Sequence, residues 1–164
     1  MIVVADTSPL NYLILIGEAD LLYKLYGRVL IPQAVLSELQ HSGAPMEVAR
    51  WFKNCPAWLE VRQVVIASEA GADELDSGEC EALALAEEFK PDVLLLMDEE
   101  TGRMAAARRN IRSTGTLGVL DDAASRGLVD VSVAIEKLRK TNFRAAESLF
   151  AWLIAGDRQR KNLR

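Results

Sequence analysis

Hydrophobic positions along the chain fall into short unbroken runs and longer stretches with helical spacing. The runs at 2–5 and 93–97 are entirely apolar, as is typical of strands buried on both faces of a parallel sheet. Shorter extended segments are predicted at 29–31, at 61–66 and near Ile111. Strands that alternate with helices indicate an α/β fold, a three-layer α/β/α sandwich with a central parallel sheet.

Helices are predicted where apolar residues recur every three or four positions. They lie at about 10–16, 18–26, 32–40, 46–54, 78–89 and 101–110, and a further helix runs through Leu120 to Gly127. Gly17 and Gly27 are placed to end two of them. We expect a polar loop at 69–77 and an extended or turn segment at 128–133. One or two helices should follow, with Trp152 packing the last one against the domain.

Length and composition fit one globular domain. The chain has 164 residues, of which 26% are charged, and this length allows a sizeable core. No apolar run approaches the roughly 20 residues that span a bilayer, and the N-terminus lacks the basic region of a signal peptide. We therefore expect a cytoplasmic protein without membrane contact. Residues 1–164 should form a single domain, with an added helical segment from about 132 to 164.

Charge and residue content narrow the possible chemistry. His41 is the only histidine, which almost excludes histidine-based triads and histidine-rich zinc sites. Cys55 and Cys80 form no disulfide framework or cysteine metal motif. The net charge of −5 argues against broad electrostatic binding of nucleic acid but allows a local basic patch. Hydrolysis would therefore depend on carboxylates, hydroxyls or a metal ion.

Both fully apolar runs end on an aspartate. Asp6 follows the first run and Asp98 follows the second. Ligands of open α/β sheets bind at the carboxyl ends of the strands, so both carboxylates are candidate site residues. Ser8 and Pro9 read as the N-cap and first position of a helix, which places Asp6 beside a helix N-terminus. Taken alone, Asp6 would be better explained as a residue that caps a turn.

Two glutamates on the apolar faces of predicted helices are further candidate site residues. At about 100° per residue, Glu38 falls inside the apolar arc of its helix, and so does Glu79. Glu81, in the same helix as Glu79, falls on the opposite side and should face solvent. A carboxylate that faces the core is costly unless it meets a cation. For Glu79 the alternative is a first-turn acid that complements the helix dipole.

Four such acids in one cleft would repel one another strongly. Two unit charges about 4 Å apart cost about 4 kcal/mol at an effective dielectric near 20, so protons or cations must neutralise the cluster. Oxygen ligands without histidine or cysteine favour Mg²⁺ or Mn²⁺. A site of this kind suits attack of metal-activated water on a phosphodiester.

Several segments together resemble the PIN-domain proteins, in particular the VapC-type ribonuclease toxins of toxin–antitoxin modules. The resemblance covers about residues 2–129 and depends on the order of five segments. These are Val4–Leu10 (VADTSPL), Ile31–Leu39 (IPQAVLSEL), Gly78–Ala86 (GECEALALA), Leu95–Glu99 (LLMDE) and Gly115–Leu120 (GTLGVL).

The resemblance implies a PIN-like sandwich, Mg²⁺-dependent endoribonuclease activity, a homodimer and inhibition by a cognate antitoxin protein. It places the catalytic acids at Asp6, Glu38, Glu79 and Asp98. Of these, Asp6, Asp98 and Glu79 would bind the metal ion, and the hydroxyl residues Ser8 and Thr116 would support its ligand shell. Glu79 departs from the family pattern, in which the third acid is usually an aspartate.

Arg103, five residues after Asp98, is the candidate contact to the RNA substrate. It could equally lie on a solvated helix face and pair with Glu99 or Glu100. An alternative function is a catalytically inert PIN fold kept for binding and dimerisation, which would bind no Mn²⁺ and spare RNA. A phosphotransfer enzyme with an aspartyl nucleophile is disfavoured, because the second aspartate that dehalogenase-like enzymes use is replaced by Ser8.

Overall fold

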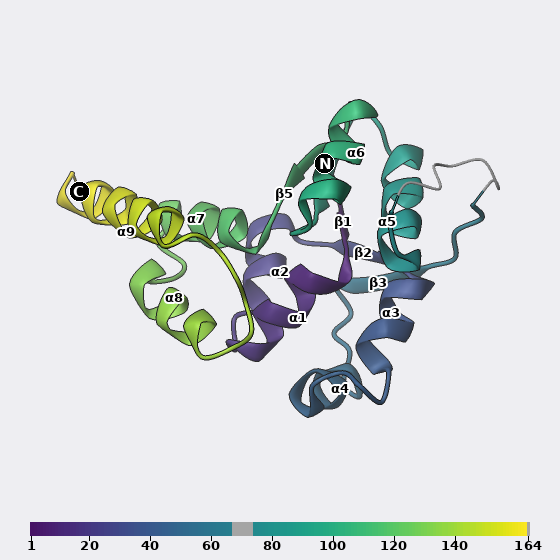
Figure 1. Cartoon of the computed structure of the whole chain (residues 1–164), viewed down its shortest axis with the longest axis horizontal. Helices are drawn as coiled ribbons and strands as arrows, with labels where there is room; N and C mark the ends of the chain where they lie inside the picture. Colours follow the sequence, from purple (N-terminus) through teal and green to yellow (C-terminus); the bar gives the residue numbers. More distant parts are fainter. Residues whose placement is uncertain (67–73, 164) are drawn as a thin grey trace.

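A five-stranded parallel sheet forms the centre of the protein (Figure 1). The computed structural model describes residues 1–66 and 74–163. Across the sheet, the strands follow the order β3 (Leu59–Arg62), β2 (Val29–Pro32), β1 (Ile2–Ala5), β4 (Val93–Leu96) and β5 (Arg112–Thr114). Every neighbouring pair is parallel, which confirms the predicted α/β architecture.

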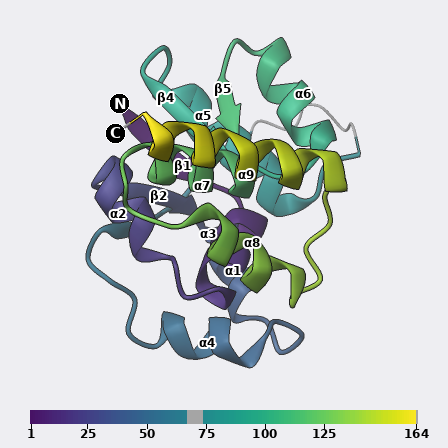
Figure 2. The ribbon, with the colours of Figure 1, turned by 90° about the vertical axis from the view of Figure 1, so that its left-hand side faces the viewer.

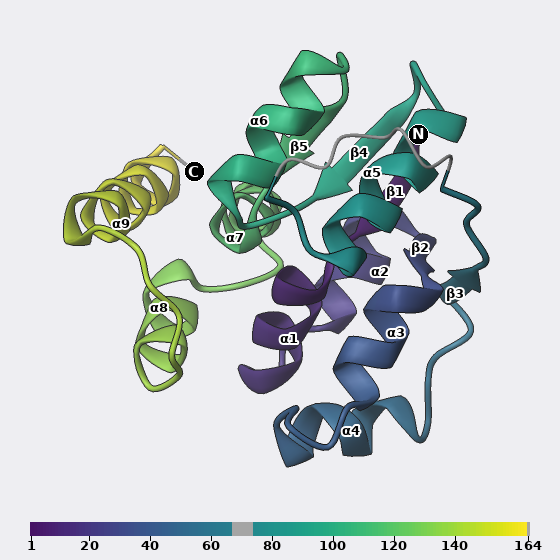
Figure 3. The same cartoon turned by 45° about the vertical axis from the view of Figure 1, so that its right-hand side comes forward.

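Helices cover both faces of this sheet (Figure 3). In the described part of the chain they are α1 (Thr7–Leu15), α2 (Asp20–Tyr26), α3 (Gln33–Gln40), α4 (Met46–Phe52), α5 (Ser77–Glu88), α6 (Glu100–Arg108), α7 (Thr116–Ser125), α8 (Val131–Arg139) and α9 (Glu147–Asn162). Side chains alternate along a strand, so Val4 packs with α5 and α6 while Val3 and Ala5 pack with α1, α2 and α7. None of these helices combines the length and apolar character needed to cross a membrane.

The strand order creates a crevice at one edge of the sheet. β1 lies in the middle, with β2 on one side and β4 on the other, so the chain changes direction across the sheet between β1 and β4. Such a switch point is where ligands bind in open α/β sheets. Asp6 directly follows β1, and Asp98 comes two residues after β4. The topology therefore brings both aspartates to this edge.

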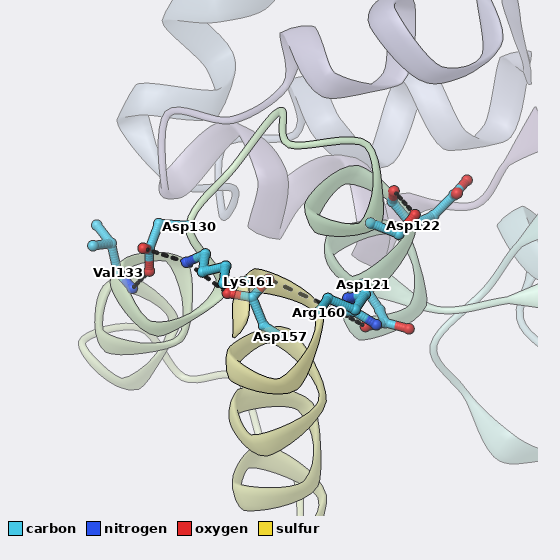
Figure 4. A network of polar contacts seen from close by, with 8 residues as sticks. Asp121, Asp122, Asp130, Val133, Asp157, Arg160 and Lys161 are labelled. Atoms are coloured by element: carbon cyan, nitrogen blue, oxygen red, sulfur yellow. Dashed lines mark hydrogen bonds and ion pairs between the residues drawn. The ribbon is translucent and has the colours of Figure 1, made fainter. Parts of the chain in front are cut away.

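A network of charged side chains fixes the C-terminal helix on the domain (Figure 4). Asp157 on α9 is only 2% exposed, and its Oδ2 lies 2.7 Å from Nζ of Lys161. Lys161 also reaches Asp130, the N-cap of α8, at 2.8 Å. Arg160 lies 2.7 Å from Asp121 on α7. These ion pairs join α9 to α7 and α8, beside which it lies in Figure 2.

The inner face of α9 carries Phe150 and Leu153, both buried in the core. Its first turn is tied to α8 by Arg139, which pairs with Glu147 at 2.6 Å and lies over the ring of Phe150. The side chain of Trp152 is 66% exposed and is not part of the core. The prediction that Trp152 packs this helix against the domain is therefore wrong.

Other differences from the predicted elements concern their ends. β3 begins at Leu59 rather than near 61, and α8 begins at Val131, where an extended segment was expected. α1 begins at Thr7, so Asp6 rather than Ser8 takes the N-cap position. The predicted loop at 69–77 lies mostly outside the described residues, and α5 begins at Ser77. Gly17 and Gly27 have positive φ angles, as expected of residues that end helices.

Candidate active site

Asp6 is buried at the carboxyl end of β1 with one oxygen left without a partner. Its backbone N–H donates to the carbonyl of Leu96 on β4 at 2.9 Å, which fixes it beside the neighbouring strand. Its side chain makes no capping hydrogen bond to α1, although Asp6 occupies the N-cap position. The residue is 3% exposed, and within the described residues Oδ1 is buried with no hydrogen-bond partner. Turn capping therefore does not account for this carboxyl.

The surroundings of Asp6 disfavour its charge. The pKa of Asp6 is raised to about 8, chiefly by burial, although the backbone N–H of Thr7 opposes the shift. The charges of the acids Asp76, Glu79 and Glu38 contribute to the same increase. A buried carboxyl among other carboxyls stays neutral near pH 7 or recruits a cation.

Glu38 links three elements beside Asp6. The hydroxyl of Thr7 on α1 donates to Oε2 of Glu38. The backbone N–H of Gly78 on α5 donates to Oε1 at 3.2 Å. A Cβ atom at position 78 would lie 2.6 Å from that same oxygen, so any other residue there would displace the carboxyl group of Glu38. Glu38 thus lies at the acid cluster, with its two oxygens engaged by α1 and α5.

Glu79 is buried in the first turn of α5, where it takes part in a capping box with Asp76. The backbone N–H of Asp76 donates to Oε2 of Glu79 at 3.1 Å, and that of Glu79 donates to Oδ1 of Asp76 at 2.8 Å. Burial raises the pKa of Glu79, and the charges of Asp76, Glu99 and Glu38 add to the increase. Glu79 therefore combines the inward orientation with the first-turn role that was its alternative.

Asp76 is a further acid of this cluster that sequence reasoning missed. Of the charged side chains that raise the pKa of Asp6, it has the largest effect. Its spacing from Glu79, Asp-x-x-Glu, is the sequence pattern of a capping box and could have identified it. Glu81 was also interpreted incorrectly: it accepts the backbone N–H of Ala34 at 2.9 Å and joins α5 to the start of α3, rather than facing solvent.

Asp98 is held by the N-terminus of α7. The backbone N–H of Thr116 donates to its Oδ1 at 2.6 Å, and the hydroxyl of Thr116 donates to its Oδ2 at 2.7 Å. A Cβ atom at Gly115 would lie 2.6 Å from Oδ1. Burial raises the pKa of Asp98, while the bonds from Thr116 and the charge of Arg103 lower it and Glu99 raises it. Arg103 also donates to the backbone carbonyl of Asp98.

A groove of about 1010 Å³ opens beside Asp98. Ser8, Asp98 and Arg103 line it, so three of the predicted site residues face one space. Tyr12 lies in the same groove, and its hydroxyl donates to Asn142 at 3.0 Å. Burial raises the pKa of Tyr12, and the charges of Asp98 and Glu99 add to the shift.

The predicted acids form two adjoining groups. Glu79 and Glu38 both raise the pKa of Asp6, and Glu38 also raises that of Glu79, whereas Asp98 is bound to Thr116 and faces the groove. Glu99 raises the pKa of both Glu79 and Asp98, so its charge acts on both groups. In residues 1–66 and 74–163, no three Asp, Glu, His or Cys side chains are arranged to hold a metal ion.

The donor atoms nonetheless suit a hard divalent cation. Oδ1 of Asp6 is buried without a partner among residues 1–66 and 74–163, and a cation is the species that relieves a carboxylate surrounded by other acids. Each oxygen of Asp98 accepts one hydrogen bond and keeps a further acceptor site. Carboxylate oxygens are the ligands that Mg²⁺ and Mn²⁺ prefer. An ion would have to draw the two groups of acids together.

Comparison with known proteins identifies one family. The model of the PIN domain matches residues 2–156 and so covers almost the whole chain. No significant match is found among curated proteins or among solved structures.

Proposed function

Because the chain belongs to the PIN-domain family, whose fold is a nuclease fold, we propose that it is a Mg²⁺-dependent endoribonuclease. Its substrate would be RNA, and its reaction the hydrolysis of phosphodiester bonds by metal-activated water. The observation that carries the proposal is Asp6, a buried carboxyl with an unpartnered oxygen and acids as its charged neighbours. In the described part of the chain, the charged side chains that act on Asp6 are acids and no cation is among them, as expected of a site that takes up a metal ion.

In this proposal, Asp6 and Asp98 hold the ion directly, with Glu79 as a third ligand. When bound, the ion supplies a water molecule of lowered pKa and neutralises charge on the phosphate. Thr116 fixes the orientation of the Asp98 carboxylate through two hydrogen bonds. Glu38 holds the start of α1, next to Asp6, to the first turn of α5, which carries Glu79, through Thr7 and Gly78.

Ser8 and Arg103 line the groove through which RNA would reach these acids. In our proposal, Ser8 supports the ligand shell and the guanidinium of Arg103 binds a substrate phosphate. Arg103 already donates to the carbonyl of Asp98, which ties any phosphate contact to the position of the β4–α6 turn.

The test compares metal-dependent RNA cleavage by Asp6→Asn, Asp98→Asn and a matched control, Glu88→Gln. Glu88 is an exposed acid near the end of α5. We expect each asparagine variant to lose more than about 100-fold in cleavage rate, since loss of a metal ligand exceeds the usual effect of an outer-shell change. Mn²⁺ titration by calorimetry should show weakened binding in both variants. Full cleavage by both would remove the proposal.

We further propose that the protein is the toxin of a toxin–antitoxin module, acts in the cytoplasm and forms a homodimer. The family match and the ordered sequence segments support this assignment. Co-expression with the product of a short neighbouring reading frame should suppress RNA cleavage, and sedimentation should give twice the chain mass. If the purified protein binds no Mn²⁺ and spares RNA, the inert binding module is the better assignment.

A further inference from the structure

The groove beside Asp98 has a second wall that the proposed reaction leaves without a role. The wall comes from the α8–α9 connection and the first turns of α9: Phe143, Ala145, Ala146, Leu149, Trp152 and Leu153. These side chains are uncharged, and the same connection also brings the polar Asn142 and the cation Arg144 to the groove. The opposite wall comes from the end of β4 and the start of α6 and carries Asp98, Glu99, Glu100 and Arg103. The α8–α9 wall of the groove is therefore mainly apolar, with Arg144 as its charged residue, and the β4–α6 wall is mainly charged.

Two side chains of the apolar wall are conspicuously exposed. Trp152 is 66% exposed and Leu149 is 41% exposed, whereas Phe150 and Leu153 of the same helix are buried. The helix cannot simply turn to bury them, because Asp157, through its pairing with Lys161, belongs to the network that fixes α9 (Figure 4). The fold thus holds a large aromatic side chain in the groove without using it for packing.

We propose that this wall, with Trp152 as its main aromatic surface, binds the bases of a single-stranded RNA whose phosphate lies at Asp98. The inference rests on the proposed ribonuclease function and names where its substrate lies. A nucleotide has the same two-sided character as the groove, with a charged phosphate and a flat, largely apolar base. Proteins bind unpaired bases by stacking them on aromatic side chains. The groove would therefore orient the strand with its phosphates toward the acids and their ion, and its bases toward α9.

The cations of the groove support a nucleic acid over a protein segment. Arg103 and Arg144 both line it. Among the described residues, Arg144 makes no ion pair, and its charge acts on Tyr12 in the same groove. Unpaired arginines suit phosphates. A docked amphipathic helix lays its apolar face into a hydrophobic groove, whereas charged side chains also line this groove, namely Asp98, Glu99, Glu100, Asp121, Arg103 and Arg144.

The experiment measures RNA binding and RNA cleavage on the same set of variants. Trp152→Ala removes the aromatic surface and Trp152→Phe retains it. Tyr23→Ala is the control, because Tyr23 is an exposed aromatic residue on α2 that does not line the groove. The probe is a short dye-labelled single-stranded oligoribonucleotide of mixed sequence, and its fluorescence anisotropy in the presence of Ca²⁺ measures binding. The thermal unfolding temperature of the Trp152 variants should equal that of the wild type, because Trp152 contributes little to the core.

We expect Trp152→Ala to weaken binding roughly 5- to 150-fold, the range for loss of one stacked base. KM should rise with little change in kcat, as for a contact made equally in the ground and transition states. Trp152→Phe should retain most of the affinity, and Tyr23→Ala all of it.

Other outcomes separate this inference from the proposed function. Wild-type protein that cleaves RNA, with Trp152→Ala equal to it in affinity and KM, would overturn the inference and leave the function standing. If the protein cleaves no RNA but binds it in a way that depends on Trp152, the proposed function is wrong and the inference stands. If wild-type protein binds no RNA, the inference is wrong. It is also wrong if Trp152→Ala abolishes only the binding of an inhibitory protein, because the wall is then a protein-docking surface.

Discussion

Two aspartates are almost completely buried among the residues that the structure describes, and their surroundings are opposite in charge. Asp157, on α9, is 2% exposed and pairs with Lys161 at 2.7 Å. Asp6, at the end of β1, is 3% exposed, and the charged side chains that act on it most are the acids Asp76, Glu79 and Glu38. Among the described residues, a lysine thus balances the charge of Asp157, whereas the charged side chains that act on Asp6 are other acids.

The difference separates a structural charge from a functional one. The buried Asp157 pairs with Lys161 and Arg160 of its own helix, and these two cations in turn reach Asp130 at the start of α8 and Asp121 on α7 (Figure 4). A buried carboxyl among acids destabilises the fold unless a proton or an external cation neutralises it. A destabilising buried carboxyl indicates a functional role, and in our proposal the role of Asp6 is to bind a metal ion.

The largest effect on stability is expected from Asp6→Asn in metal-free protein. The pKa of Asp6 is raised from 3.8 to about 8. A raised carboxyl pKa means that stability is lost as pH rises from about 4 to about 8, because the unfolded chain ionises first. The neutral asparagine has no such loss, so the variant should gain on the order of 3–5 kcal/mol in unfolding free energy at pH 8. Near pH 4 the gain should vanish.

Urea unfolding in EDTA at these two pH values measures this gain. Mn²⁺ should raise the stability of the wild type at pH 8 far more than that of Asp6→Asn, because only the wild type has a charge to neutralise. A variant no more stable than the wild type at pH 8 would show that Asp6 is compensated by some other group.

The same substitution at Asp157 should have the opposite sign. Asp157→Asn removes the charge that Lys161 meets at 2.7 Å and Arg160 at 3.9 Å. Both cations keep partners of their own, Asp130 and Asp121, which limits the loss to about 1–3 kcal/mol. Urea unfolding gives the size, and faster hydrogen exchange confined to α9 would locate it. If Asp157→Asn is more stable than the wild type, the surroundings of Asp157 and Asp6 do not differ in charge as described.

Local sequence patterns predicted most of the fold, because they depend on neighbouring residues alone. The apolar runs at 2–5 and 93–97 gave the central strands, and the α/β alternation gave the layers. The edge strand β3 was misplaced because it is only partly buried, with just Leu59 in the core. The start of α8 was missed although Asp130 caps it by accepting the N–H of Val133.

The candidate site was harder to predict, because it depends on contacts between distant elements. Helix periodicity placed Glu79 inward correctly, but it could not show that Glu81 would meet the start of α3 at Ala34. It could not show that both oxygens of Asp98 would bind Thr116. It also predicted a packed Trp152, whereas the tertiary structure turns that side chain into the groove.

The smallest predicted effect separates the two contributions of Asp76, which caps α5 and adds negative charge beside Asp6. Asp76→Ala removes the capping bond to Glu79 and should cost about 1 kcal/mol. Asp76→Asn retains a capping acceptor and removes the charge, so in metal-free protein at pH 8 it should equal or slightly exceed the wild type in stability, because ionised Asp6 then has one acid fewer beside it. Urea unfolding of the two variants side by side makes the comparison. Equal losses in both would mean that the charge of Asp76 itself stabilises the fold, contrary to the electrostatic account of this cluster.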